Sequence, residues 1–204
     1  MAKLILVRHG SIRLQQRDER FWGKTDVELS DTGIKQSEKL RDRLAKEKVT
    51  AIYSSSLYRA RTTAHLIASK HGLNVQHCEE LDECNFGYVE GLTFAEIQNL
   101  HPELAKSLIG FDMNVQFPGG ESFRDLNKRV RSFLKRLADH KERDKDTIIV
   151  VAHGGPLLLL VCHLLEIDSS NWRKMRLELA SVSIINTYPG GVILNSLNDI
   201  SHLK

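Results

Sequence analysis

Two short apolar runs, one near each end of the chain, share the same ending. Residues 3–10 read KLILVRHG and residues 147–155 read TIIVVAHGG, so each run stops at a histidine followed by glycine. An unbroken run of Ile, Leu and Val is typical of a parallel strand that is covered on both faces. Ligands of open α/β sheets bind beyond the carboxyl ends of such strands. The two runs therefore predict a functional site that contains His9 and His153.

The composition limits the number of domains and the kinds of partner. The chain has 204 residues, of which 41% are hydrophobic and 27% charged, and no Pro/Gly/Ser-rich linker divides it. We therefore expect one domain over residues 1–204. The net charge is only +3, and the basic residues are mixed with acidic ones, as on solvated helix faces. We expect no nucleic-acid partner.

The cysteines and the hydropathy pattern bear on metal binding and location. The three cysteines form no CxxC pair, which argues against a disulfide framework and against a zinc site. No apolar run reaches membrane-spanning length, and the first residues enter a strand without an apolar signal core. We expect a cytoplasmic protein with no membrane contact and no metal site.

Strand-like and helix-like segments alternate along most of the chain. This alternation predicts right-handed crossovers and a single-domain, three-layer α/β/α fold with a mainly parallel central sheet. The predicted helices cover about 31–46, 57–71, 93–109 in two pieces broken at Pro102, and 121–141. The remaining predicted strands cover about 50–54, 74–77, 181–186 and 192–197, the last two as a hairpin or two neighbouring strands at the sheet edge.

Two helical segments carry further expectations. Either Ser30 or Asp31 is expected to cap the helix at 31–46, with a buried stripe of Ile34, Leu40 and Leu44. The segment at about 93–120 is interpreted as a lid whose apolar residues suit an apolar substrate group. These residues are Leu104, Leu108, Ile109, Phe111, Met113, Val115 and Phe117, and burial in the protein's own core is an equally weighted alternative for each.

A third strand-to-helix junction adds positive charge to the predicted site. The serines at 54–56 lead into a helix with Arg59 and Arg61 in its first turns, and Arg59, nearer the helix start, is expected to face the crevice. Gly154 follows His153 and opens a helix whose amides can bind an anion, so it is an expected substrate contact. A pocket this cationic is costly to assemble unless a dianion such as phosphate fills it. The pattern favours phosphoryl chemistry.

Other classes of phosphoryl-transfer enzyme have sequence motifs that this chain lacks. There is no GxxxxGK[ST] loop for nucleotide phosphates, and no cysteine is followed by an arginine at the spacing of a cysteine phosphatase loop. Asp144 and Asp146 precede a strand, whereas an aspartyl-phosphate motif follows one. No HExxH or comparable metal cluster is present. Histidine remains as the nucleophile.

Four motifs occur in a fixed order along the chain. They are the RHG triplet at Arg8–Gly10, an SSxLxRAxxTA signature at 55–64, the acidic-loop residues Leu81–Glu83 with Phe86–Gly87 and Glu90–Gly91, and His153 in VVAHGG. In these motifs the chain resembles the histidine phosphatase superfamily, also called the phosphoglycerate mutase-like family. The resemblance covers nearly the whole length. It implies the phosphoglycerate mutase-like fold and an enzyme without a cofactor.

The resemblance also implies a role for each site residue. His9 is the nucleophile that becomes phosphorylated, and Arg8, Arg59 and His153 hold the transferring phosphoryl group. Glu83 is the general acid and base: it begins protonated, protonates the departing alkoxide and then takes a proton from water. The implied substrate is a small phosphomonoester.

The chain departs from the family pattern just after RHG. Ser11 and Ile12 stand where many members have Glu and then Thr or Ser, so one hydroxyl near the phosphate pocket is missing or displaced. An asparagine that is common in mutases is not evident in this stretch, where Gln15 and Gln16 are the candidates to replace it. Gly23, after RFW, is expected to offer its main-chain amide to the substrate.

Within the family, several segments are most similar to α-ribazole phosphatases of cobalamin biosynthesis. These segments are FPGGESF at 117–123, the RFWGKTDVELS stretch and the LNDISHL tail. The short lid favours hydrolysis over phosphoryl return to a sugar acid, so we expect an α-ribazole-5′-phosphate phosphatase. A phosphoglycerate mutase and a catalytically inactive binding or scaffold member remain the alternatives, and a homodimer remains open.

Overall fold

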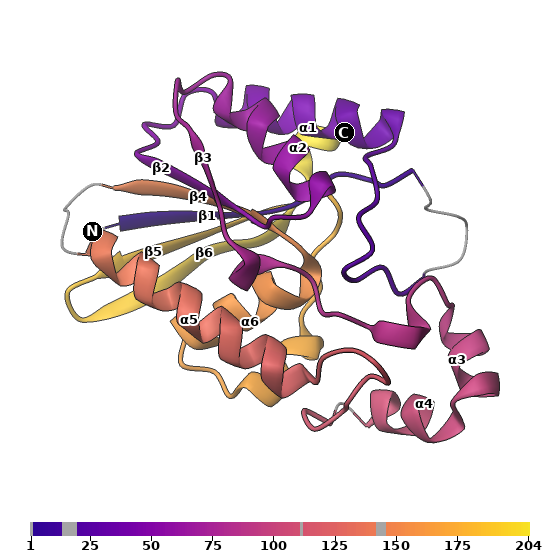
Figure 1. Cartoon of the computed structure of the whole chain (residues 1–204). Helices are drawn as coiled ribbons and strands as arrows, with labels where there is room; N and C mark the ends of the chain where they lie inside the picture. The colour runs from indigo at the N-terminus through magenta and orange to yellow at the C-terminus, as the bar shows by residue number, and fades with distance from the viewer. Residues whose placement is uncertain (1, 14–19, 111, 142–145) are drawn as a thin grey trace.

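The computed structural model describes residues 2–13, 20–110, 112–141 and 146–204. A six-stranded sheet with the order β3-β2-β4-β1-β5-β6 lies between two helical layers (Figure 1). The four strands from β3 to β1 are parallel, and β5 and β6 are antiparallel to their neighbours. The predicted α/β/α class with a mainly parallel sheet is confirmed. The strands are β1 (Ala2–Arg8), β2 (Ala51–Ser54), β3 (Val75–His77), β4 (Thr147–Ala152), β5 (Val182–Tyr188) and β6 (Gly191–Asp199).

The two apolar runs are neighbouring parallel strands at the centre of the sheet. All residues of β4 are buried, because both of its faces are covered by helices. The register pairs Val7 with Val151 and Arg8 with Ala152, so the two strands end at the same level. This register brings His9 and His153 to one edge of the sheet.

The helices divide between the two faces of the sheet. Helices α1 and α2 cover one face, α5 and α6 cover the other, and α3 and α4 project to one side (Figure 1). Each face has its own apolar core: Ile5 and Val7 point to the α1–α2 side, and Leu4 and Leu6 to the α5–α6 side. The helices are α1 (Asp31–Leu44), α2 (Tyr58–Ala68), α3 (Phe94–Leu100), α4 (Pro102–Ile109), α5 (Phe123–Lys141) and α6 (Gly154–Leu164).

Helix α1 is capped by Ser30, whose hydroxyl accepts a hydrogen bond from the Gly33 amide at 3.1 Å. The predicted buried stripe is correct for Leu40 and Leu44, but Ile34 is only half-buried. Gly33 is buried in its place because the chain after β1 crosses α1 there. A Cβ on Gly33 would lie 1.9 Å from the Ser11 carbonyl oxygen, so the crossing requires glycine.

The segment at 93–120 begins with a capped helix. The hydroxyl of Thr93 accepts from the Glu96 amide, and the Glu96 carboxylate accepts from the Thr93 amide. Pro102 separates the two helical pieces as predicted, and it stands at the first position of α4, where its missing N–H has no cost.

The apolar residues of this segment mostly belong to the core. Leu108, Val115 and Phe117 are buried, and Leu104 and Met113 are half-buried against the same cluster. Ile109 is 62% exposed, and Phe111 lies outside the described residues. For Leu108, Val115 and Phe117 the alternative of burial in the protein's own core is therefore confirmed, and the interpretation as a cover for an apolar substrate group is wrong.

Candidate active site

His9 stands directly after β1 and is almost completely buried. Its Nδ1 lies 2.7 Å from the Gly10 carbonyl oxygen, which can only accept, so Nδ1 carries the hydrogen and Nε2 keeps its lone pair. Burial, and then the positive charges of Arg59 and Arg8, hold the pKa of His9 well below its usual value. His9 is a neutral imidazole whose Nε2 has a lone pair for nucleophilic attack.

His153 stands directly after β4 and is the N-cap of α6. Its ring meets that of His9 with centroids 4.9 Å apart and planes inclined by 60°. Nδ1 accepts a hydrogen bond from Nε of Arg59 at 3.2 Å, and Nε2 lies 2.8 Å from Ser55 Oγ. Burial, and then the charge of Arg59, keep the pKa of His153 well below its usual value. This histidine is neutral as well.

Arg59 is in the first turn of α2 and faces the site, as predicted, with only 1% of its surface exposed. Besides Nε, its guanidinium donates to the carbonyl oxygens of Thr25 at 2.9 Å and Gly23 at 2.6 Å. Arg61 lies elsewhere, over the ring of Tyr58. The guanidinium of Arg59 is therefore fixed in place before any ligand binds.

Arg8 and Glu83 approach the start of α6 from two sides. Arg8 is half-buried and donates to the Leu177 carbonyl oxygen. A Cβ on Gly154 would lie 3.8 Å from Cζ of Arg8 and 4.0 Å from Oε2 of Glu83. Gly154 therefore lies close to both Arg8 and Glu83, and a side chain at this position would fill the space beside them.

Glu83 is anchored at the N-terminus of α6. Its Oε2 accepts from the Gly155 amide at 3.2 Å, and its Oε1 accepts from the Cys84 amide at 3.0 Å. These two hydrogen bonds fix the position of the carboxyl group at the start of the helix. The structure thus brings together His9, His153, Arg8, Arg59, Glu83 and Gly154.

Gly23 lies beside this group, but its amide already has a partner. It donates to Oε2 of Glu90 at 3.1 Å, which also accepts from the amide and hydroxyl of Thr25, while Oε1 accepts from the amides of Lys24 and Phe86. Glu90 thereby holds the turn at 23–25, whose Gly23 and Thr25 carbonyl oxygens accept hydrogen bonds from Arg59. The sequence marked Glu90 only as part of a motif, since its partners are distant along the chain.

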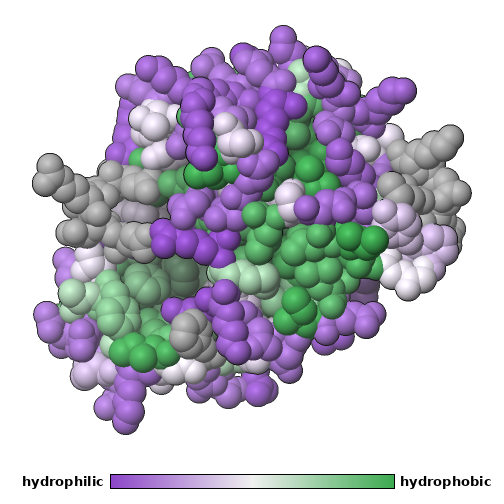
Figure 2. Space-filling view, turned by 180° about the vertical axis from the view of Figure 1, so that it is seen from behind, coloured by the Kyte–Doolittle hydropathy of each residue, from purple (hydrophilic) through white to green (hydrophobic). Residues whose placement is uncertain are grey.

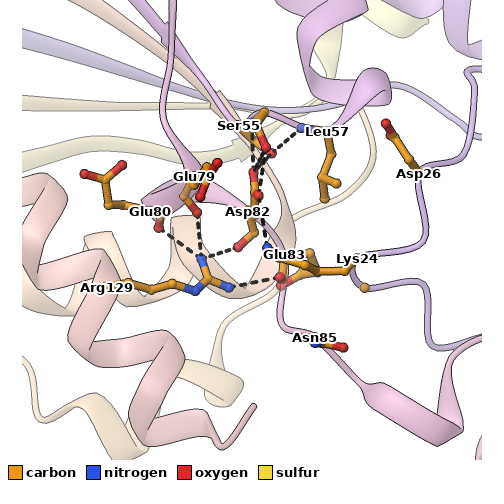
Figure 3. Close-up of polar contacts among 12 residues, drawn as sticks. Lys24, Asp26, Ser55, Leu57, Glu79, Glu80, Asp82, Glu83, Asn85 and Arg129 are labelled. Atoms are coloured by element: carbon orange, nitrogen blue, oxygen red, sulfur yellow. Dashed lines mark hydrogen bonds and ion pairs between the residues drawn. The ribbon is translucent and has the colours of Figure 1, made fainter. Parts of the chain in front are cut away.

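Arg129 of α5 was not identified from the sequence, because an arginine on an amphipathic helix usually faces solvent. Figure 3 shows its guanidinium against the main chain of the acidic loop at 79–83. It donates to the carbonyl oxygens of Glu80 at 3.1 Å, Asp82 at 2.6 Å and Glu83 at 2.9 Å. It also forms a two-pronged ion pair with Glu121, at 2.8 and 2.9 Å. Arg129 therefore holds the loop that presents Glu83.

The two residues after RHG contact the chain that leads into α1 and α1 itself. Ile12 is buried and pairs with Leu29 in an isolated antiparallel bridge. The Ser11 amide donates to the side-chain oxygen of Gln36 at 2.8 Å. The proposed substitutes Gln15 and Gln16 lie outside the described residues.

The part of the chain that the structure describes contains neither a cluster of metal ligands nor a membrane-spanning helix. Within it, no three His, Cys, Asp or Glu side chains gather as a metal site would require. None of the described helices is both long and apolar enough to cross a membrane. Cys78, Cys84 and Cys162 are buried thiols, and burial raises the pKa of Cys78 to about 11.

Comparison with known proteins assigns the family. Residues 4–200 match the model of the histidine phosphatase superfamily, branch 1, so this chain belongs to the histidine phosphatase superfamily and is an enzyme of that family.

Relatives and solved structures place the chain among phosphatases. It is 32% identical to phosphoserine phosphatase 1 of Hydrogenobacter thermophilus, over all of this chain and 95% of the relative. The phosphoserine phosphatase of Entamoeba histolytica, solved with phosphoserine, has a TM-score of 0.86 and 30% identity, with both chains covered completely. The α-ribazole phosphatase of Shigella flexneri has a TM-score of 0.87 and 26% identity, covering 97% of this chain and 96% of that one.

Proposed function

We propose that this protein hydrolyses small phosphomonoesters through a phosphohistidine at His9. The observation that carries the proposal is the neutral His9, with its hydrogen on Nδ1 and its Nε2 lone pair beside Arg59 and His153. An imidazole in this state attacks phosphorus without first losing a proton.

The reaction has two balanced steps. In the first, Nε2 of His9 bonds to phosphorus, the ester P–O bond breaks, and a protonated Glu83 gives its proton to the leaving oxygen. In the second, the Glu83 carboxylate takes a proton from water, the water oxygen bonds to phosphorus, and the P–N bond breaks. Phosphate leaves, and His9 and Glu83 return to their first states.

The surrounding cations suit this transfer. Phosphate-monoester hydrolysis is among the slowest uncatalysed reactions, and its loose transition state spreads charge over three oxygens. Arg8 and Arg59 supply fixed donors, with His153 and the Gly154 amide beside them, and their arrangement needs no further ordering as charge develops. The Gly23 amide donates to Glu90 in this structure. It can donate to a phosphoryl oxygen of the substrate only after that hydrogen bond is broken.

The substrate proposal has two candidates. α-Ribazole 5′-phosphate is supported by the Shigella neighbour and by the segments noted in the sequence. Phosphoserine is supported by relatives of that name at about one-third identity over the full chain. The apolar lid no longer separates them, because its side chains lie largely in the core. Phosphoglycerate mutase activity is the remaining enzymatic alternative.

A direct comparison of substrates tests these proposals. Phosphate release is measured from α-ribazole 5′-phosphate, phosphoserine and an aryl phosphate, beside interconversion of 2- and 3-phosphoglycerate primed with bisphosphoglycerate. Hydrolysis that exceeds mutase flux supports the phosphatase, and the highest kcat/KM identifies the substrate. Mutase flux above phosphate release would overturn the hydrolase proposal, and inactivity on every compound would favour a binding or scaffold role.

We also propose a homodimer that forms through β6. This strand pairs with β5 on one side only among the described residues, and its other backbone edge is open. Figure 2 shows a continuous apolar area on the back of the molecule, over the β5–β6 hairpin. Ile193 of β6 is 52% exposed, and β6 carries a single charged residue, Asp199, so this edge has few of the charges that discourage pairing with a second copy.

The mass in solution tests the dimer. Light scattering at micromolar concentration is expected to give twice the chain mass, and Ile193→Lys is expected to give the monomer. The control is Ile109→Lys, which changes an exposed apolar residue on α4. A monomeric unmodified protein would contradict the proposal.

The cytoplasmic location also remains a proposal, supported by three buried thiols.

A further inference from the structure

Asp82 precedes Glu83 in the acidic loop, but its side chain points toward the serines that lead into α2 (Figure 3). Its carboxylate is almost completely buried. It accepts hydrogen bonds from the Ser55 hydroxyl at 2.7 Å, from the Ser56 amide at 2.8 Å and from the Ser56 hydroxyl at 2.8 Å. No step of the proposed phosphoryl transfer uses this buried acid.

The Ser55 hydroxyl links Asp82 to His153. A hydroxyl has one hydrogen, and Ser55 gives it to the Asp82 carboxylate, which only accepts. The contact of 2.8 Å between Ser55 Oγ and His153 Nε2 therefore requires Nε2 to carry a hydrogen and to donate it. The Leu57 amide donates to the same oxygen at 3.1 Å, so both of its lone pairs are used.

This tautomer is the one that Arg59 requires. A neutral His153 with its hydrogen on Nε2 has a lone pair on Nδ1, which accepts from Nε of Arg59. In the other tautomer, two N–H groups would face each other across 3.2 Å. Both ring nitrogens of His153 thus have protein partners, which places His153 to act on the phosphoryl group through Arg59.

We propose that Asp82 is a positioning residue for the phosphoryl-transfer site, an inference that rests on the proposed function. Through Ser55 it fixes the tautomer and ring plane of His153, and through His153 it fixes the guanidinium of Arg59. Glu83, the next residue, performs the proton transfer. Two consecutive residues of the acidic loop thus supply the acid and the side chain that positions His153 and Arg59.

The tautomer of His153 can be observed directly. In the ¹⁵N-labelled protein, imidazole ¹⁵N–¹H correlations are expected to place the hydrogen of His153 on Nε2. The Asp82→Leu variant keeps the approximate size of the side chain but has no acceptor, so the Ser55 hydroxyl is free to turn toward Nε2 of His153. The hydrogen of His153 is expected to move to Nδ1, and kcat for an aryl phosphate is expected to fall at least about 10-fold.

Two further variants separate this role from general support of the loop. Ser55→Ala breaks the same connection and is expected to reduce kcat similarly, and the double variant to lose little more than the worse single one. Glu80→Gln changes an acid of the same loop that contacts Arg136, and it is expected to leave kcat and the His153 signals unchanged.

Two results would overturn the inference. One is a hydrogen on Nδ1 of His153 in the unmodified protein, and the other is an Asp82→Leu variant in which both tautomer and kcat are unchanged. If the unmodified protein lacked phosphatase activity but its His153 tautomer still responded to Asp82→Leu, the positioning by Asp82 would stand and only the proposed function would fail.

Discussion

His9 and His153 meet at a centroid distance of 4.9 Å, and both are almost completely buried beside the guanidinium of Arg59. Protonation of either ring would bury another positive charge next to the arginine, which is why both pKa values lie well below the usual one. The folded site is therefore cationic through its arginines, while its histidines stay neutral. This division leaves the nucleophile reactive at neutral pH.

The first prediction is that the free energy of unfolding falls as pH drops below about 6.5. Unfolded histidines bind protons from that pH downward, whereas buried His9 and His153 do not, so the unfolded state binds more protons. Stability contributed in this way is fully present above about pH 6.5 and is lost toward the lower folded pKa values. Urea unfolding between about pH 5 and 8 measures the slope. Each of His9→Gln and His153→Gln is expected to make it shallower, and a slope unchanged in both would contradict the prediction.

The second prediction concerns the covalent intermediate. His9→Ala is expected to abolish turnover, because Nε2 of His9 supplies the lone pair that attacks phosphorus, whereas both ring nitrogens of His153 are already in hydrogen bonds. Rapid acid-free quenching of the unmodified enzyme with ³²P-labelled substrate is expected to label His9 with an acid-labile phosphoryl group. His163→Gln is the control, since His163 contacts Asn127 away from the site. Label on another residue, or near-normal turnover without His9, would refute the mechanism.

The third prediction separates Glu83 from the other acids of its loop. Glu83→Gln removes the proton that the leaving oxygen needs, so hydrolysis of alkyl phosphates is expected to slow by about 10²–10⁴-fold. Phosphorylation by an aryl phosphate is expected to suffer much less, because a phenolate leaves without a proton. Burst kinetics on matched substrates measure both effects. Equal losses for the two substrates would exclude the role of Glu83 as an acid.

The sequence predicted the residues that stand at strand ends better than those that support them. His9, Arg59 and His153 follow or flank strand-to-helix junctions, and parallel strands bring such positions together whatever the details of packing. Arg129 and Glu121, in contrast, meet the acidic loop only through tertiary packing of α5. Their spacing from Glu83 along the chain carries no local signal, and charged residues in or just before an amphipathic helix usually face solvent.

For the apolar residues of the 93–120 segment, the sequence left open whether they cover the substrate or lie in the core. Apolar residues at helical spacing predict a buried face, but they do not reveal what covers it. In the structure Phe117 packs between Phe86 and Phe123, so an expected ligand contact is a link between the acidic loop and α5. The burial of Gly33 could not be predicted from the sequence either, because it depends on where the chain after β1 crosses α1.

The fourth prediction is that Arg129 stabilises the acidic loop. Arg129→Met would leave the Glu121 carboxylate and the carbonyl oxygens of Asp82 and Glu83 without these donors, which is expected to cost about 2–4 kcal/mol of unfolding free energy. Arg136→Met removes a half-exposed ion pair with Glu80 and is expected to cost less than about 1 kcal/mol. Urea unfolding of both variants makes the comparison, and equal small losses would contradict the role of Arg129.

The last prediction uses the two glycines that open α6. A Cβ on Gly155 would lie 2.5 Å from Oε1 of Glu83, so Gly155→Ala is expected to displace that carboxylate. A Cβ on Gly154 meets nothing closer than Cζ of Arg8 at 3.8 Å, but it would occupy space between Arg8 and Glu83. Gly155→Ala is therefore expected to lower kcat for alkyl phosphates more than for aryl phosphates, whereas Gly154→Ala is expected to raise KM for both alike.

Steady-state kinetics of the two alanine variants on one alkyl and one aryl phosphate distinguish these effects. Both changes add a single methyl group at neighbouring positions of one helix, so helix propensity contributes equally to each. If Gly155→Ala showed the same loss of kcat for both substrates, Glu83 would not be the group that it displaces. If Gly154→Ala left KM unchanged, the phosphoryl group would bind away from the space between Arg8 and Glu83, and the proposed position of the substrate would be wrong.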